Sequence, residues 1–203
     1  MTERERMEQG LLYLPGDPDL AREQLQRLDK LFEYNALRPG EQEKKQQLLK
    51  EMFAEIGEGC YIETPFHANF GGKKVHFGKK VYANFNLTLV DDESIYVGDC
   101  VKFGPNVVVC TAAHPILPAL RRKEYQYNLP VHIASGVWIG AGAIILPGVS
   151  IGENSVIGAG SVVTRDIPPN VVAVGNPCRV MRSINENDKI YYYRDKKIDF
   201  EVE

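Results

Sequence analysis

An unbroken period of six in the hydrophobic positions dominates the chain between residues 133 and 163. Every block of six opens on an aliphatic residue, at Ile133, Ile139, Ile145, Ile151, Ile157 and Val163. A small residue follows in all blocks but one, and Ala, Val or Ser takes the fifth place until the last block. This period fits neither the 3.6-residue repeat of a helix nor the alternation of a long strand. It predicts a coil that turns a corner every six residues and points one side chain per face to its axis.

The same period is present upstream, with one slip. Phe77, Ala83 and Leu89 stand six apart, and after two extra residues the phase resumes at Val97 and runs to Val109. Three faces of six residues make one turn, so about 18 residues climb one strand spacing of roughly 4.8 Å. Each aliphatic residue is therefore expected to lie on the one 18 residues before it. So thin a coil leaves flat outer faces that need partners, which favours a symmetric trimer or larger assembly.

Residues 114–130 interrupt the period with prolines, charges and aromatics. Val109 and Ile133 lie 24 residues apart, which is four times six, so the coil resumes in phase. We interpret the segment that begins at His114 as a loop that protrudes from the coil. Loops of this length in a compact domain tend to be functional.

The N-terminal part has helical spacing instead. A helix is predicted to begin at Asp17, which can cap the free N–H groups, with Pro18 at the first helical position. Its expected apolar stripe is Leu20, Leu25, Leu28, Leu31 and Phe32. A second helix is predicted from Glu41 to Ile56, stopped by Gly57. The chain thus divides into a helical appendage (1–56), the coil with its loop (57–178) and a tail (179–203), in which a short helix is expected over 187–194.

Composition and charge narrow the class of protein. Of 203 residues, 44% are hydrophobic and 25% are charged, as in ordinary soluble domains. The formal net charge of −3 provides no basic surface for nucleic acid or an anionic membrane. The first residues are charged and no run of about 20 apolar residues occurs. We therefore expect neither a signal peptide nor a membrane span, and the cytoplasm as the location.

Several segments resemble one family. Tyr82-Ala-Asn-Phe-Asn, Thr111-Ala-Ala-His-Pro, Val137-Trp-Ile-Gly and Asp166-Ile-Pro-Pro-Asn are similar to the maltose/galactoside O-acetyltransferases, which are hexapeptide-repeat acyltransferases. The resemblance implies an all-β dominated fold, a left-handed parallel β-helix with an N-terminal α-helical appendage on the substrate side and a protruding loop. The left hand comes from the resemblance alone, because the usual crossover rule predicts a right hand.

The resemblance also implies an activity. The family transfers acetyl from acetyl-coenzyme A, a cosubstrate, to a sugar hydroxyl, typically the 6-hydroxyl, without a covalent enzyme intermediate. It works as a homotrimer with active sites between subunits. The expected acceptor is therefore a sugar such as maltose, glucose or a galactoside.

The family's site residues match positions of this sequence. His114 would be the general base, because an imidazole can take the hydroxyl proton and return it to the leaving thiolate. Asn84 would contact the substrate and stabilise the oxyanion. Asp17, Asn69 and Asp92 would hold sugar hydroxyls. Two of these residues have a simpler interpretation, Asp17 as a helix cap and Asn84 as a corner residue.

The coenzyme is expected along the coil. Its predicted contacts are Asn84, Ala141, Ala159, Thr164, Arg165, Arg179 and Arg182. Ala141 stands where the family often has Ser, so only its backbone N–H can serve. The two arginines after residue 178 would meet the phosphates, which guanidinium groups bind well. Gln24 stands where the family has Arg, which leaves the sugar specificity open.

Three other functions compete with this one. The same scaffold serves acetyltransferases for other acceptors, such as an antibiotic, an amine or serine. A coil that only oligomerises would need neither His114 nor Asn84. A γ-type carbonic anhydrase would bind zinc, but His67 and His76 are nine residues apart, His132 lies far on, and no cysteine stands near a histidine at zinc spacing. We therefore expect no metal.

Overall fold

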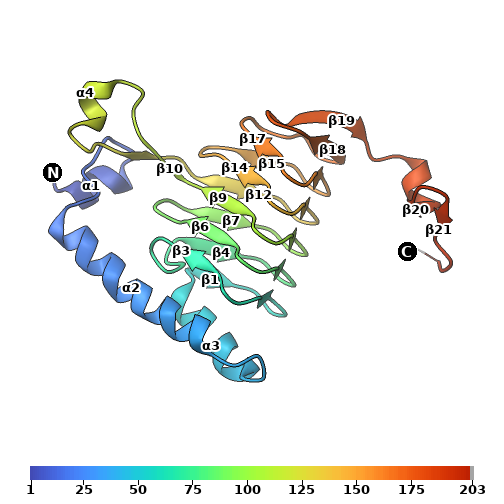
Figure 1. Cartoon of the computed structure of the whole chain (residues 1–203), viewed down its shortest axis with the longest axis horizontal. Coiled ribbons are helices and arrows are strands. Elements are labelled where there is room, and N and C mark those ends of the chain that lie inside the picture. The colour runs from blue at the N-terminus through green and yellow to red at the C-terminus, as the bar shows by residue number, and fades with distance from the viewer. Residues whose placement is uncertain (202–203) are drawn as a thin grey trace.

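The computed structural model describes residues 1–201, and its body is a three-sided parallel coil (Figure 1). The first face holds β1 (Glu55–Ile56), β4 (Val75–Phe77), β7 (Ile95–Val97), β12 (Val131–Ile133) and β15 (Ser150–Ile151). The second face holds β2 (Tyr61–Ile62), β5 (Tyr82–Ala83), β8 (Lys102–Phe103), β13 (Trp138–Ile139), β16 (Val156–Ile157), β18 (Val171–Val174) and β19 (Arg179–Ser183). The third face holds β3 (His67–Ala68), β6 (Thr88–Val90), β9 (Val108–Cys110), β14 (Ile144–Ile145) and β17 (Val162–Val163).

The period of six is confirmed as the register of the coil. Ile157 pairs with Ile139, 18 residues earlier, and the opening aliphatic residues of all six blocks are buried. One detail of the prediction was wrong, because each face buries two positions and not one. The fifth places, among them Val137, Ser155 and Ser161, are buried as well. The two serines are tolerated inside because their hydroxyls hydrogen-bond the backbone of the last turn.

Three helices precede the coil: α1 (Glu3–Glu8), α2 (Pro18–Ala36) and α3 (Gln42–Met52). Asp17 caps α2 as predicted, because its Oδ1 accepts the N–H of Asp19 at 3.0 Å and of Leu20 at 3.3 Å. The predicted end of the second helix was wrong. That helix stops at Met52, since Glu55–Ile56 already pairs with β4. Helix α1 was not predicted, although Thr2 and Glu5 form a capping box there.

The apolar stripe of α2 is narrower than its spacing indicated. Leu20 and Leu31 are buried and Leu28 packs against the core, but Leu25 and Phe32 are 65% and 77% exposed. Helical spacing defines a stripe, but the width of the surface beneath it decides how much of that stripe is covered.

The interruption predicted at residues 114–130 is confirmed, and it has its own structure. β10 (Ala112–Ala113) leaves the coil, α4 (Pro118–Arg121) forms its tip, and β11 (Tyr127–Asn128) returns antiparallel to β10. Figure 1 shows this excursion beside α1, away from the body of the coil.

The C-terminal part departs from expectation. A 3-10 turn, η1 (Glu186–Lys189), is followed by the hairpin of β20 (Tyr191–Tyr193) and β21 (Lys196–Lys197). The prediction of a helix over 187–194 was wrong, because three consecutive tyrosines favour a strand. The last two residues of the tail, 202 and 203, lie outside the described residues. No helix within residues 1–201 is long and apolar enough to cross a membrane.

We predict that Ile157→Ala lowers the free energy of unfolding by about 2–5 kcal/mol. The substitution leaves a cavity in a column that neighbouring turns cannot close. Val156→Ala is the matched control, because this half-buried neighbour points outward, and a loss below about 1 kcal/mol is expected there. Chemical denaturation measures both variants. Equal losses at the two positions would contradict the stacked interior.

Candidate active site

One edge of the coil, between its second and third faces, carries three predicted site residues. Asn84 follows β5, Ala141 follows β13 and Ala159 follows β16, and we call them the amide edge. The turns stack tightly there. A Cβ added at Gly104 would lie 2.6 Å from the Ala141 nitrogen, and one at Gly140 would lie 2.6 Å from the Ala159 nitrogen. The edge therefore has little side-chain cover, and its backbone is held rigidly.

The side chain of Asn84 is anchored at one end. Its Oδ1 accepts the N–H of Phe85 at 2.7 Å, and its backbone N–H donates to the carbonyl of Phe103 at 3.0 Å. The Nδ2 group makes no hydrogen bond within residues 1–201. This amide is thus oriented by its oxygen and has both of its N–H donors available to a ligand.

The opposite edge of the third face carries four further predicted residues, and we call it the loop edge: Asp92, His114, Thr164 and Arg165. Asp92 follows β6, while the exposed Thr164 and Arg165 follow β17. His114 follows β10 at the start of the excursion and is exposed. The structure thus divides these seven residues between two edges of one chain.

The imidazole of His114 has a defined orientation. Its Nδ1 lies 2.9 Å from the backbone carbonyl oxygen of Tyr125, on the returning side of the excursion. A carbonyl only accepts, so Nδ1 carries the proton and the lone pair of the neutral ring is on Nε2. The exposed Nε2 is therefore the atom able to take a proton from a substrate.

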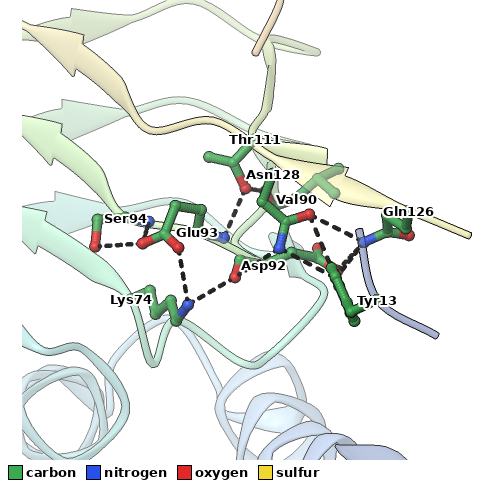
Figure 2. Close-up of polar contacts among 9 residues, drawn as sticks. All are labelled: Tyr13, Lys74, Val90, Asp92, Glu93, Ser94, Thr111, Gln126 and Asn128. Atoms are coloured by element: carbon green, nitrogen blue, oxygen red, sulfur yellow. Dashed lines mark hydrogen bonds and ion pairs between the residues drawn. The ribbon is translucent and has the colours of Figure 1, made fainter. Parts of the chain in front are cut away.

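A buried polar cluster joins the excursion to the coil (Figure 2), and we call Tyr13, Asp92, Gln126 and Asn128 the polar knot. The Nε2 of Gln126 donates to Asp92 Oδ1 at 2.9 Å and lies 2.5 Å from the Tyr13 hydroxyl. Asn128 donates to the same hydroxyl at 3.1 Å. Burial raises the pKa of Tyr13 far above its ordinary value, so the phenol stays protonated. Tyr13 and Asn128 were missed in the sequence, where single polar residues in irregular segments give no signal.

Asp92 itself is only 2% exposed. Its Oδ2 accepts from the Nδ2 of Asn69 at 2.8 Å, and the Oδ1 of Asn69 accepts from the Nε2 of Gln24 at 2.7 Å. The Lys74 ammonium donates to the backbone carbonyl of Asp92 at 2.9 Å. The buried carboxylate of Asp92 thus holds amide donors on both of its oxygens, and a sugar hydroxyl has little access to it. Gln24, which stands where the family has Arg, takes part in the same chain of hydrogen bonds.

Asp17 keeps one oxygen available. Both of its capping bonds end on Oδ1, while Oδ2 has no partner within residues 1–201. The side chain is half-buried. Helix capping and contact with a ligand are therefore compatible at this residue.

Asp91 fixes the corner that presents Asn69. It is fully buried, and its carboxylate accepts the N–H of Phe70 at 2.7 Å and of Gly72 at 2.8 Å. Gly72 has φ +91, and a Cβ there would lie 2.5 Å from the Phe53 ring. Desolvation raises the pKa of Asp91 to about 6, against the two backbone hydrogen bonds that lower it.

The two arginines expected at the phosphates lie on β19 and are exposed. Arg179 donates to the carbonyl of Cys178 at 2.7 Å. Arg182 forms a bidentate pair with Asp188 at 2.7 and 2.8 Å, which lowers the pKa of that carboxyl. A phosphate at Arg182 would thus compete with Asp188, whereas Arg179 has no acidic partner within residues 1–201.

The three histidines of the zinc hypothesis do not meet. His76 and His132 lie on the first face, on either side of Tyr96, with ring centroids 4.6 and 4.8 Å from it. His67 is on the third face. In the part of the chain that the structure describes, no three His, Cys, Asp or Glu side chains gather to hold a metal.

Two family models match the chain. Residues 6–57 match the maltose acetyltransferase hexapeptide capping motif, and residues 130–165 match the bacterial transferase hexapeptide of six repeats. The galactoside O-acetyltransferase of Lactococcus lactis subsp. lactis is 57% identical over 190 residues, which cover 94% of this chain and 92% of that protein.

Solved structures agree over the same length. A galactoside acetyltransferase in complex with coenzyme A superposes with a TM-score of 0.95 at 46% identity, covering 98% of this chain and 100% of that one. A maltose O-acetyltransferase from Clostridium difficile 630 gives a TM-score of 0.89 at 42% identity, covering 92% and 99%. The coil is thus a left-handed parallel β-helix of hexapeptide repeats, as the resemblance implied.

We predict a pH-dependent contribution of Asp91 to stability. Its folded pKa of about 6 lies above the ordinary 3.8, so the contribution is complete below about pH 3.8 and is lost as pH rises through about 6. The unfolding free energy of the wild type relative to Asp91→Asn should therefore fall between pH 4 and 6. The fall is at most about 1.4 kcal/mol per unit of pKa difference.

Urea unfolding at several pH values measures this difference. Asp29→Asn, which removes an exposed carboxylate from α2, is the matched control. A difference between wild type and Asp91→Asn that stays constant from pH 4 to 6 would count against a raised pKa at Asp91.

Proposed function

The chain belongs to the maltose/galactoside O-acetyltransferase family and is an acetyl-coenzyme A-dependent O-acetyltransferase, and we propose that His114 is the general base that activates the hydroxyl of a sugar. The acceptor we propose is the 6-hydroxyl of maltose, glucose or a galactoside. The hydrogen bond from His114 Nδ1 to the Tyr125 carbonyl carries the proposal, because it leaves the basic Nε2 free and exposed. The cytoplasmic location expected from the sequence remains a prediction.

The reaction follows from these groups. Nε2 of His114 takes the hydroxyl proton while the sugar oxygen attacks the thioester carbonyl carbon. The Nδ2 donors of Asn84 stabilise the oxyanion of the tetrahedral intermediate, an interaction worth on the order of 3 kcal/mol. Collapse breaks the carbon–sulfur bond, and the imidazolium returns its proton to the thiolate of coenzyme A. The acetyl group ends on the sugar, and the imidazole is neutral again.

The sugar is held from the side of the N-terminal helices. Asp17 Oδ2 is the free acceptor there, and Asn69 and Asp92 form the wall behind it. Gln24 supplies an amide where the family has a guanidinium. The group formed by Gln24, Asn69 and Asp92 therefore carries one positive charge less than it would with the family's arginine. We infer an acceptor that is held by hydroxyl contacts and needs no anionic group.

The coenzyme is proposed to lie along the amide edge. Backbone groups of Ala141 and Ala159 would bind its extended arm, together with Thr164 and Arg165 from the loop edge of a neighbouring chain. Arg179 and Arg182 would bind its phosphates, since exposed guanidinium groups pair with phosphate oxygens.

We further propose a homotrimer in which each site uses two chains. Asn84 and His114 lie at opposite edges of the third face, and six residues at about 3.3 Å each span up to roughly 20 Å. Both groups have to reach one thioester carbonyl, so they must come from different chains. The outward row of this face, Val108, Ile144 and Val162, is apolar and half-buried. Turning this face to a threefold axis covers the row and brings the amide edge beside a neighbour's loop edge.

We predict that His114→Ala lowers acetyl transfer by at least ~100-fold, the low end for a lost acid–base group. Coenzyme A binding should survive, because the imidazole does not hold the coenzyme. Thiol release from acetyl-coenzyme A measures the rate with maltose, glucose, a galactoside and, as comparison, amine acceptors. Transfer within a few-fold of wild type would remove His114 as the base, and preference for an amine would overturn the sugar assignment.

Mixed trimers test the shared site. Asn84→Ala and His114→Ala chains, each inactive alone, should regain about a third of the wild-type sites when they assemble together. In a two-to-one trimer, one interface joins an intact Asn84 to an intact His114. Two affinity tags isolate the mixed species, and light scattering verifies three chains. Mixed trimers no more active than either parent would place both groups in one chain.

A further inference from the structure

The returning strand of the excursion connects the proposed base to the N-terminal segment through one peptide group. The carbonyl of Tyr125 accepts from His114 Nδ1 at 2.9 Å. The N–H on the other end of the same peptide, that of Gln126, donates to the carbonyl of Tyr13 at 3.0 Å. The two groups of a trans peptide point to opposite sides of one rigid plane. The position of Tyr13 therefore determines the direction from which the imidazole is held.

The side chain of Gln126 locks this peptide to the coil. Gln126 is 8% exposed, and its Nε2 donates to Asp92 Oδ1 at 2.9 Å and lies 2.5 Å from the Tyr13 hydroxyl (Figure 2). The Tyr13 N–H donates in turn to the Gln126 carbonyl at 3.0 Å. A buried amide with partners on three segments fixes their relative position, because removing it takes hydrogen bonds from several buried polar groups at once.

We propose that Gln126 is a positioning residue that fixes His114, the proposed base, relative to Asp92 and to the segment that leads into Asp17. Its backbone N–H and its side chain bind the segment that leads into Asp17, its side chain binds Asp92, and the peptide before it orients His114. The inference rests on the proposed function, because it assumes that His114 acts as the base. Gln126 touches no reacting atom, and its effect passes through His114 and Asp92.

Gln126→Leu tests this role, since it removes the amide and keeps a similar volume. We expect kcat for transfer to a galactoside to fall at least ten-fold and the KM for the galactoside to rise, with the KM for acetyl-coenzyme A within two-fold of wild type. A smaller folded fraction would instead lower the apparent kcat and leave both KM values unchanged, so the raised KM for the galactoside distinguishes the positioning role from a loss of folding. Tyr127→Phe is the matched control, because its hydroxyl on the same strand has no hydrogen bond within residues 1–201.

His114→Ala, assayed beside these variants, distinguishes a failure of the positioning role of Gln126 from a failure of the proposed function. If His114→Ala is inactive and Gln126→Leu keeps kcat within two-fold, the positioning role is wrong and the proposed function stands. If His114→Ala is active, the proposed function fails first. Where Gln126→Leu does not fold, Gln126→Glu replaces it. This isosteric variant places a second carboxylate against Asp92, and wild-type kcat in it likewise overturns the positioning role.

Discussion

The close stacking of one turn of the coil on the next is the constraint on which the rest of this structure depends. At Gly104 and Gly140 the turns leave no room for a Cβ, and aliphatic residues such as Ile139 and Ile157 fill the interior. Each strand is short and ends at a corner, so a shift of one turn would displace every turn above it. The coil therefore has straight, rigid edges and little freedom to form a pocket of its own.

Several residues of the proposed site lie where extra residues depart from this stack, and burial determines which polar contacts these residues make. Asp91 and Asp92 follow β6 and are both buried, which is costly for a carboxylate unless its oxygens are hydrogen-bonded. Asp91 accepts two backbone N–H groups, and Asp92 accepts side-chain donors from Asn69 and Gln126. Throughout residues 1–201, no buried side-chain nitrogen or oxygen lacks a hydrogen-bond partner. The departures from the coil are thus structured by their polar contacts.

This difference explains what the sequence could predict. The column of Ile139 and Ile157, the excursion after residue 113 and the cap at Asp17 follow from local spacing and were predicted correctly. The polar knot was not, since the contact of Tyr13 with Gln126 joins residues 113 apart and no period marks it. Phe32 was expected on the apolar stripe of α2 but is exposed. Helical spacing alone does not tell where the coil beneath a helix ends. The left hand needed the family resemblance.

The amide edge and the loop edge of the proposed site differ in rigidity, and this difference fits the roles proposed for Asn84 and His114. In the proposed mechanism Asn84 presents its donors to a developing charge without moving, and this residue lies on the stacked backbone of the coil. The proposed base, His114, would take a proton from one atom and return it to another, and it lies on the excursion, held by one hydrogen bond to the Tyr125 carbonyl. Within one chain, His114 on the loop edge lies across the width of the third face from Asn84 on the amide edge. In the proposed trimer, a segment anchored by Gln126 would let the imidazole reach the amide edge of a neighbouring chain, while its Nδ1 stays fixed by the Tyr125 carbonyl.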